Sequence, residues 1–276
     1  MMTRSRRLQV VSKLAVAMLV AACICGGQVI AEPLPLPMGT AVVDGVLDEW
    51  EGANWIAMDK VYHGDPSDLS NAQWAAMWAP DMIYVAVRGV DNVHVFNDTN
   101  VSWNAQDSVE IYVDSANKNV SGYSSTFSDA QQYVGSPSAS QPDEEWLTLP
   151  LTTGPLDALG TGIVPAFEAV VDGQTIRYEI AIRPYSALNI NHPESSTVLT
   201  LSPGMTLGLD VVMDTKYGDQ GDDFGMLCEN MATGKFGNAD LFLDHITVPE
   251  PSTFVLLLAS AACLIFCLRR RHGRGK

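Results

Sequence analysis

The stretch WNAQDSVEIYVD, from Trp103 to Asp114, decides the fold. From Asp107 onward its apolar and polar residues alternate, which is the period-two pattern of a β-strand with one buried face. The polar face carries Glu110 and Tyr112, and Trp103 lies just before the strand. An aromatic ring beside an acid is suited to a sugar, whose apolar face stacks on the ring while its hydroxyls bond to the carboxylate. A tryptophan at a strand entrance can equally be a core residue, so both interpretations stay open.

Other segments show the same alternation. Residues 72–78 and the run MIYVAVRGVD after Pro80-Asp81 predict one hairpin, and FEAVVDGQTIRYEIAI predicts another around Asp172-Gly173. MTLGLDVVMD and ADLFLDHITV are strand-like, and a further strand is expected near residues 127–134 in a loop-rich region. No helix longer than two turns is compelling. The sequence therefore predicts one all-β domain, an antiparallel β-sandwich over residues 40–247, with Trp50 capping its core.

The N-terminal end carries a predicted secretory signal peptide, residues 1–31. Basic residues precede an apolar run near residues 14–24, and small residues then offer a cleavage site. The run is shorter than the roughly 20 residues of a membrane-spanning helix. A lipoprotein processing site at Cys23 is the alternative. Residues 32–39 follow as an extended, proline-rich leader outside the core.

The C-terminal end, residues 248–276, combines a Pro-Glu-Pro triplet, an apolar run at 254–268 and a basic cluster. Basic residues after a span predict a cytoplasmic C-terminus. This tail resembles the PEP-CTERM sorting signal of bacteria, which an exosortase recognises. The resemblance implies a transmembrane helix at 254–268 that holds the protein transiently in the inner membrane, before transfer to the cell surface or extracellular matrix. A permanent anchor is the alternative. The sorting residues are Pro249, Glu250, Pro251, Arg269, Arg270 and Arg271.

Between the two ends the chain is strongly acidic. Residues 33–248 contain 7 basic and 30 acidic side chains, a net charge of −23. Nucleic acid is not expected as a partner, because its binding depends on basic side chains that neutralise phosphate. Of the five cysteines only Cys228 lies outside the predicted targeting segments, so no internal disulfide is expected.

The order of the segments resembles carbohydrate-binding module family 9 and its domain-monooxygenase-like β-sandwich relatives. VDGVLDEW, WAPDMIYVAVRGVD, WNAQDSVEIYVD, TIRYEIAI, GMTLGLDVVMD and KFGNADLFL follow one another as in the family. The resemblance implies a jelly-roll-like sandwich, often with structural calcium, in which two tryptophans clamp a sugar above polar residues. It places Trp103 at the first clamp position and Glu110 at a polar contact. The second tryptophan is missing before KFGN, where Asn230 lies, and Tyr133 lies where a basic contact is expected.

Catalysis is not expected. The chain lacks the HExxH and GxSxG motifs and a phosphate-binding loop. Asp107 and Glu110 would face opposite sides of a strand, which disfavours a glycosidase pair. A haem site is an alternative, but no pattern aligns axial ligands. No zinc-type spacing is found among His63, His94, His192 and His245.

Calcium is the expected cofactor, because the loop DTKYGDQGDD gathers carboxylate oxygens on a glycine-rich backbone. Its candidate ligands are Asp214, Asp219, Asp222 and Asp223; a solvated acidic turn is the alternative. Together these features predict an exported, non-catalytic envelope protein that binds a polysaccharide or sugar end, either exopolysaccharide or a substrate of carbohydrate catabolism. A structural surface sandwich without a sugar site is the alternative. The candidate sugar-binding residues are Trp103, Glu110, Tyr112, Tyr133 and Asn230.

Overall fold

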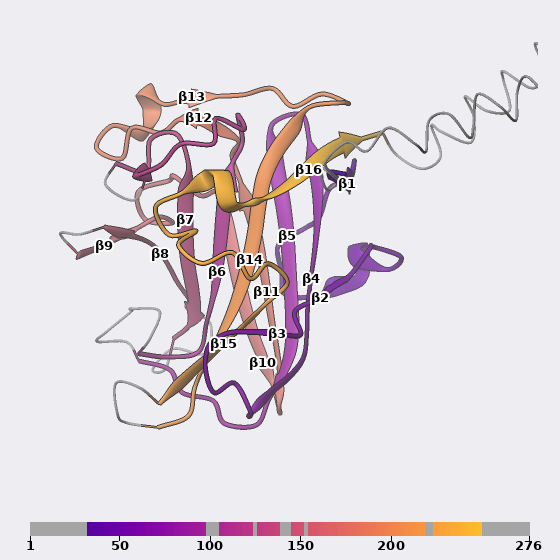
Figure 1. The fold of residues 1–276 in the computed structure, drawn as a ribbon, viewed down its shortest axis with the longest axis vertical. Helices are drawn as coiled ribbons and strands as arrows, with labels where there is room; N and C mark the ends of the chain where they lie inside the picture. Colours follow the sequence, from indigo (N-terminus) through magenta and orange to yellow (C-terminus); the bar gives the residue numbers. More distant parts are fainter. Residues whose placement is uncertain are drawn as a thin grey trace, which may run out of the picture. The chain divides into compact units, whose positions relative to one another are not determined.

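The computed structural model shows two β-sheets packed face to face (Figure 1). In the part of the chain that it describes, strands and short 3-10 turns are the regular elements, as the alternating pattern predicts. The described residues are 32–97, 105–123, 126–138, 145–151, 154–218 and 223–249.

The larger sheet has nine strands, in the order β1, β16, β14, β6, β7, β8 and β9, while β15 pairs with β14 and β3 pairs with β15. The pairs are antiparallel except β1 with β16, which is parallel. The strands are β1 (Leu34–Pro37), β3 (Lys60–Gly64), β6 (Ser108–Asp114), β7 (Gln131–Pro137), β8 (Glu145–Leu151), β9 (Gly154–Asp157), β14 (Thr206–Lys216), β15 (Phe224–Cys228) and β16 (Leu243–Val248).

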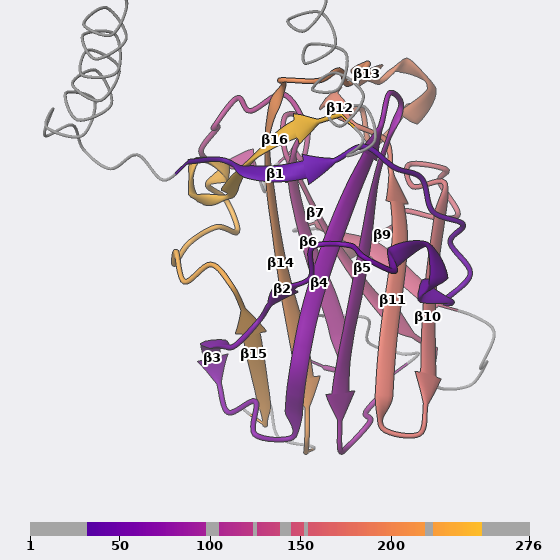
Figure 2. The same cartoon turned by 90° about the vertical axis from the view of Figure 1, so that its right-hand side faces the viewer.

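The smaller sheet has five antiparallel strands in the order β10, β11, β5, β4 and β2 (Figure 2). Both predicted hairpins are confirmed within it. Its strands are β2 (Ile56–Ala57), β4 (Leu69–Ala79), β5 (Met82–Asp91), β10 (Ala166–Asp172) and β11 (Thr175–Ile182). The remaining elements are β12 (Tyr185–Ala187), β13 (Thr197–Val198) and the 3-10 turns η1 (Leu47–Trp50), η3 (Pro193–Ser195) and η4 (Ala239–Leu241).

The main core lies between the sheets. Val109, Ile111 and Val113 of β6 are at most 1% exposed and belong to it, so this strand buries the face that its alternation predicts. The two sheets approach each other closely across the sandwich. At Gly135 of β7, for example, an added Cβ would meet the ring of Phe167 of β10. Burial of apolar surface, worth about 25 cal/mol per Å², is the main force that holds the two sheets together.

Trp50 does not cap this core. It packs instead on the other face of the five-stranded sheet, in a small cluster with Ala75, Met77 and Ala86. Its indole Nε1 donates a 2.7 Å hydrogen bond to Glu179 Oε1, and the backbone N of Gly45 donates a 2.7 Å bond to Glu179 Oε2. The N-terminal part of the domain is thereby fixed to the outside of this sheet.

The prediction that residues 32–39 are a leader outside the core is wrong for β1. Leu36 is 2% exposed and belongs to the main core, and β1 pairs with β16 over four residue pairs. Prolines lack an N–H donor but are tolerated at the edge of a sheet, where one side needs no partner. An edge position therefore explains how a PLPLP-like run can be a strand.

Two predicted strands begin later than expected. Phe127 has a positive φ of 52° and lies in a turn, so β7 begins only at Gln131. Residues 239–241 form η4, whose preceding Asn238 accepts a hydrogen bond from the N–H of Asp240, so β16 begins at Leu243. In both cases a local turn competes with the β pattern.

The predicted signal peptide, the apolar run at 254–268 and the basic cluster lie outside the described residues. Of the sorting residues, only Pro249 is described. Within the described part of the chain, no helix is long and apolar enough to cross a membrane.

Candidate functional site

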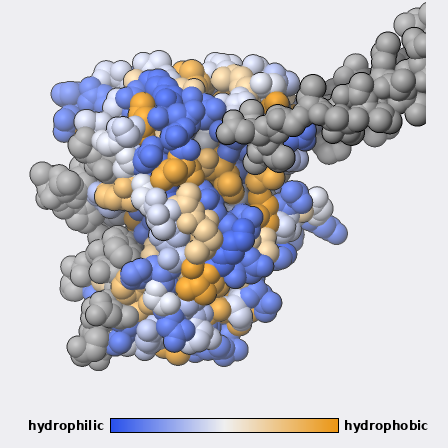
Figure 3. All heavy atoms as spheres, viewed as in Figure 1, coloured by the Kyte–Doolittle hydropathy of each residue, from blue (hydrophilic) through white to orange (hydrophobic). Residues whose placement is uncertain are grey.

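The outer face of the nine-stranded sheet, turned away from the five-stranded sheet, carries a group of polar side chains. The register places Tyr112 of β6 between Gln132 of β7 and Asp210 of β14. Glu110 lies two residues before Tyr112 on the same face. Asn230 and Lys235 reach this face from the segment between β15 and β16. Figure 3 views the molecule from this direction and shows apolar side chains among hydrophilic ones. We call Glu110, Tyr112, Gln132, Asp210, Asn230 and Lys235 the outer-face network.

The first half of the network centres on Glu110. Its Oε2 accepts hydrogen bonds from the Tyr112 hydroxyl and, at 2.9 Å, from Gln132 Nε2. Both partners are polar and buried, and Gln132 Oε1 accepts no hydrogen bond. Burial raises the pKa of Glu110, against the hydrogen bonds from Tyr112 and Gln132. Burial, followed by the nearby Glu110 charge, raises the pKa of Tyr112 well above its usual value.

The second half pairs Asp210 with Lys235. Lys235 Nζ lies 3.1 Å from Asp210 Oδ1 and donates a 2.9 Å bond to the carbonyl of Asn230. The ammonium lies over the rings of Tyr62, at 4.9 Å, and Tyr112, at 5.7 Å. Asn230 Nδ2 donates to Asp210 Oδ2. Burial raises the pKa of Asp210 to about 6, against the opposing effect of Lys235.

Asp214 extends the polar face along β14. Its Oδ2 accepts a 2.8 Å hydrogen bond from Ser108 Oγ, and its Oδ1 has no partner. Burial, followed by the charge of Glu110, raises its pKa well above the usual value. Asp223 lies just before β15, while Asp219 and Asp222 lie outside the described residues. The calcium ligand set therefore stays a prediction.

The structure separates the predicted sugar-binding residues. It brings together Glu110, Tyr112 and Asn230, whereas Trp103 lies outside the described residues. Tyr133 does not join them, because it pairs with the inward-facing Ile111 and is fully buried in the main core. The neighbouring Gln132 takes the outward position.

Three members of the outer-face network were missed in the sequence. Asp210 lies in the strand-like run GLDVVMD, where the alternation places it opposite to its inward-facing neighbours Leu209 and Val211. Lys235 opens the KFGN segment, but no sequence pattern indicates that its ammonium turns back to Asp210. Gln132 was missed because the prediction fell on the next residue, Tyr133, which faces the opposite side of the strand.

Asp107 and Glu110 belong to separate networks. Asp107 Oδ1 accepts a 2.7 Å hydrogen bond from the backbone N of Lys216, and its Oδ2 accepts one of 2.7 Å from Val95. Glu110 Oε2 accepts its hydrogen bonds from Tyr112 and Gln132. The two carboxylates are therefore held by different partners.

Comparison with known proteins identifies two segments. Residues 43–244 match the family described as carbohydrate family 9 binding domain-like, and residues 247–271 match the PEP-CTERM protein-sorting motif. No curated protein matches the chain.

Among solved structures, the fold is similar to a carbohydrate binding module family 9 from Caldicellulosiruptor kristjanssonii in complex with cellotriose. That match has a TM-score of 0.55 and 19% identity, and covers 79% of this chain and 94% of the other. A second structure, of a family 9 module from the same organism in complex with glucose, has a TM-score of 0.53 and 19% identity, and covers 79% and 96%. At this identity the likeness shows the fold.

Proposed function

Since this chain belongs to the carbohydrate family 9 binding domain-like family, we propose that its outer-face network binds a sugar end or polysaccharide without catalysing a reaction. The PEP-CTERM motif at the other end supports a location at the cell surface. The protein is then a carbohydrate-binding module of the cell envelope.

The observation that carries this proposal is an unused acceptor in the outer-face network. Gln132 Oε1 is buried and accepts no hydrogen bond. A buried acceptor without a donor costs about 1–3 kcal/mol, and a sugar hydroxyl is a donor that would satisfy it. Glu110 and Lys235 are already held in place by their neighbours, so binding would cost them little ordering entropy.

Apolar side chains nearby supply the second requirement of a sugar site. Phe236, next to Lys235, is 48% exposed, and Met231, next to Asn230, is 46% exposed. The C–H face of a pyranose ring can pack on such surfaces. The relatives in complex with cellotriose and glucose make β-glucans the first class of ligand to test.

The test is binding of the purified chain, kept in mild detergent, to cello-oligosaccharides and a panel of polysaccharides by calorimetry and affinity electrophoresis. We expect Glu110→Gln and Gln132→Met each to weaken binding at least about tenfold, because each removes hydrogen-bonding capacity at the network. The matched control is Glu168→Gln on β10 of the other sheet, which should bind like the parent. Circular dichroism checks that each variant is folded.

Two outcomes would contradict the proposal. If the parent chain binds no glycan with calcium present, the structural surface module is the better description. If it binds glycan and both network variants bind equally well, the sugar lies elsewhere on the molecule.

We further propose that the tail directs sorting by an exosortase, with passage through the inner membrane, and that the acidic loop binds a structural calcium ion. Asp214 Oδ1, buried and without a partner, supports the calcium proposal. Calcium at a hundredfold excess over its dissociation constant would stabilise the fold by about 2.7 kcal/mol. Asp223→Asn should abolish the calcium-dependent rise in melting temperature. Equal melting of the parent with chelator and with calcium would contradict it.

A further inference from the structure

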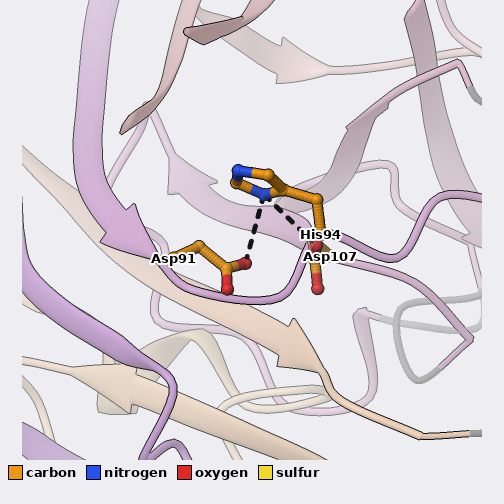
Figure 4. Close-up of side chains that lie close together, drawn as sticks. All are labelled: Asp91, His94 and Asp107. Carbon is orange, nitrogen blue, oxygen red and sulfur yellow. Dashed lines mark ion pairs between the residues drawn. The ribbon is translucent and has the colours of Figure 1, made fainter. Parts of the chain in front are cut away.

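A second group of side chains lies away from the outer-face network, where β5 ends and β6 begins. Asp91 is the last residue of β5, His94 follows three residues later, and Asp107 precedes β6 (Figure 4). His94 Nδ1 lies 3.6 Å from Asp91 Oδ2 and 3.8 Å from Asp107 Oδ2. One ligand atom from each of the three residues lies within 4.8 Å of the others. We call this group the His94 cluster.

The tautomer of His94 follows from its other nitrogen. Nε2 lies 3.0 Å from the carbonyl oxygen of Gly173, in the turn between β10 and β11. A carbonyl only accepts, so Nε2 carries a proton, and in a neutral ring with this tautomer the lone pair is at Nδ1. That lone pair faces two carboxylate oxygens and has no hydrogen-bond partner. Histidines that bind metals commonly donate their second N–H to a carbonyl in this way.

Backbone amides hold the carboxylates in position and leave one oxygen unused. Val93 N donates a 3.0 Å bond to Asp91 Oδ1, and Val95 N donates to Asp107 Oδ2. Asp91 is 1% exposed, yet its Oδ2 accepts no hydrogen bond and points at His94 Nδ1. The two carboxyl groups and the imidazole nitrogen thus converge on one point, where a cation would be bound by all three.

We propose that Asp91, His94 and Asp107 bind a divalent transition-metal ion of the zinc class. Zinc takes one imidazole nitrogen and carboxylate oxygens at about 2.0–2.2 Å, which places tetrahedral ligand atoms about 3.4 Å apart. The observed 3.6 and 3.8 Å separations are close to this value. Calcium prefers six to eight oxygens, whereas an imidazole ligand favours zinc and its neighbours.

Such an ion would join three segments that the backbone brings together from distant parts of the chain. Asp91 and Asp107 come from the two sides of the β5 to β6 connection, and the Gly173 carbonyl behind His94 comes from the β10 to β11 turn. Three protein ligands leave a fourth position for water. The role we infer is structural, at one end of the sandwich.

The test uses the full chain in mild detergent, stripped with chelator and dialysed. Titration with zinc chloride by calorimetry should show one equivalent bound, and cobalt(II) should give the visible absorption of a four-coordinate site. Zinc at a hundredfold excess over its dissociation constant should raise the melting temperature by about 5–10 °C. His94→Gln and Asp91→Asn should each weaken zinc binding at least about a hundredfold.

The matched control is His192→Gln. His192 Nδ1 lies 3.4 Å from Glu194 Oε1, a similar separation, but both side chains are at least 70% exposed. This variant should bind zinc like the parent. The cobalt spectrum of the parent chain keeps the test decisive even if a cluster variant fails to fold.

Three results would overturn the proposal. The parent chain could bind no zinc or cobalt at micromolar concentration; it could bind calcium in their place; or His94→Gln could bind zinc as the parent does. A proton shared within the His94 cluster would then account for the geometry. Since Asp223→Asn addresses the acidic loop and His94→Gln this cluster, the two metal proposals fail independently.

Discussion

His245 of β16 gives the fold a pH dependence whose size can be worked out from its environment. The side chain is 1% exposed, its Nδ1 donates a 2.9 Å bond to the carbonyl of Leu243, and its Nε2 has no partner. Its ring lies edge-on to Trp74, with centroids 5.5 Å apart. Burial lowers the pKa of His245 from 6.5 to about 4, because the charged ring cannot be hydrated there.

The sign follows from proton linkage. The unfolded chain binds this proton more readily than the folded chain, so acidification favours unfolding between about pH 6.5 and pH 4. From pH 7 to pH 5 the loss in free energy of unfolding attributable to His245 is about 1.8 kcal/mol. For a domain of this size that corresponds to roughly 4–7 °C in melting temperature.

The profile of the parent chain alone does not isolate this effect. Asp210, whose pKa is raised to about 6, acts in the opposite direction, because its folded state gains a proton as the pH falls. The comparison must therefore be with His245→Phe and His245→Gln, neither of which titrates. Urea unfolding followed by tryptophan fluorescence measures each free energy at both pH values. Relative to either variant, the parent should lose about 1.8 kcal/mol on going from pH 7 to pH 5. A difference that stays constant within about 0.5 kcal/mol would refute the assignment of a buried, neutral His245.

Three further predictions concern other parts of the chain. Glu179→Ala should lower the free energy of unfolding by about 2–3 kcal/mol, because the Trp50 indole loses its charged partner; a loss under about 0.5 kcal/mol in urea unfolding would contradict this. Lys235→Met should cost about 3–5 kcal/mol by leaving Asp210 buried without its cation, and adding Asp210→Asn should recover most of that cost; equal stability of the single and double variants would count against the pair. In a host with an exosortase, intact mass should show that the surface protein lacks the residues beyond the Pro-Glu-Pro triplet, and a mature form that keeps residues 269–276 would mark the tail as an anchor.

The sequence predicts the parts of this fold in which local pattern and burial agree. Alternation and turn residues located both hairpins of the five-stranded sheet and the inward face of β6. It failed where pairing is non-local. The prolines of the PLPLP-like run suggested an extended leader, and no local pattern reports its pairing with β16, in which Leu36 is a core residue.

The candidate site was predicted where it depends on local pattern and missed where it depends on contacts between distant segments. Glu110 and Tyr112 lie on one strand, so a period of two places them together. Gln132 and Lys235 depend on the register of β7 and on the course of the chain after β15, which no local pattern reports. Histidine spacing gave no indication of the His94 cluster, because its members meet through the ends of two strands and not through a motif.

The parallel pairing of β1 with β16 has a mechanical consequence. These strands lie near opposite ends of the described chain yet run in the same direction side by side, from Leu34 beside His245 to Pro37 beside Val248. A pull on the two ends of the domain therefore acts in opposite directions along the strands. Tension of this kind loads the interstrand hydrogen bonds in shear, so that they resist together and do not open one by one like a zipper. A domain closed by such a pair is suited to a cell surface, where flow and adhesion place proteins under tension.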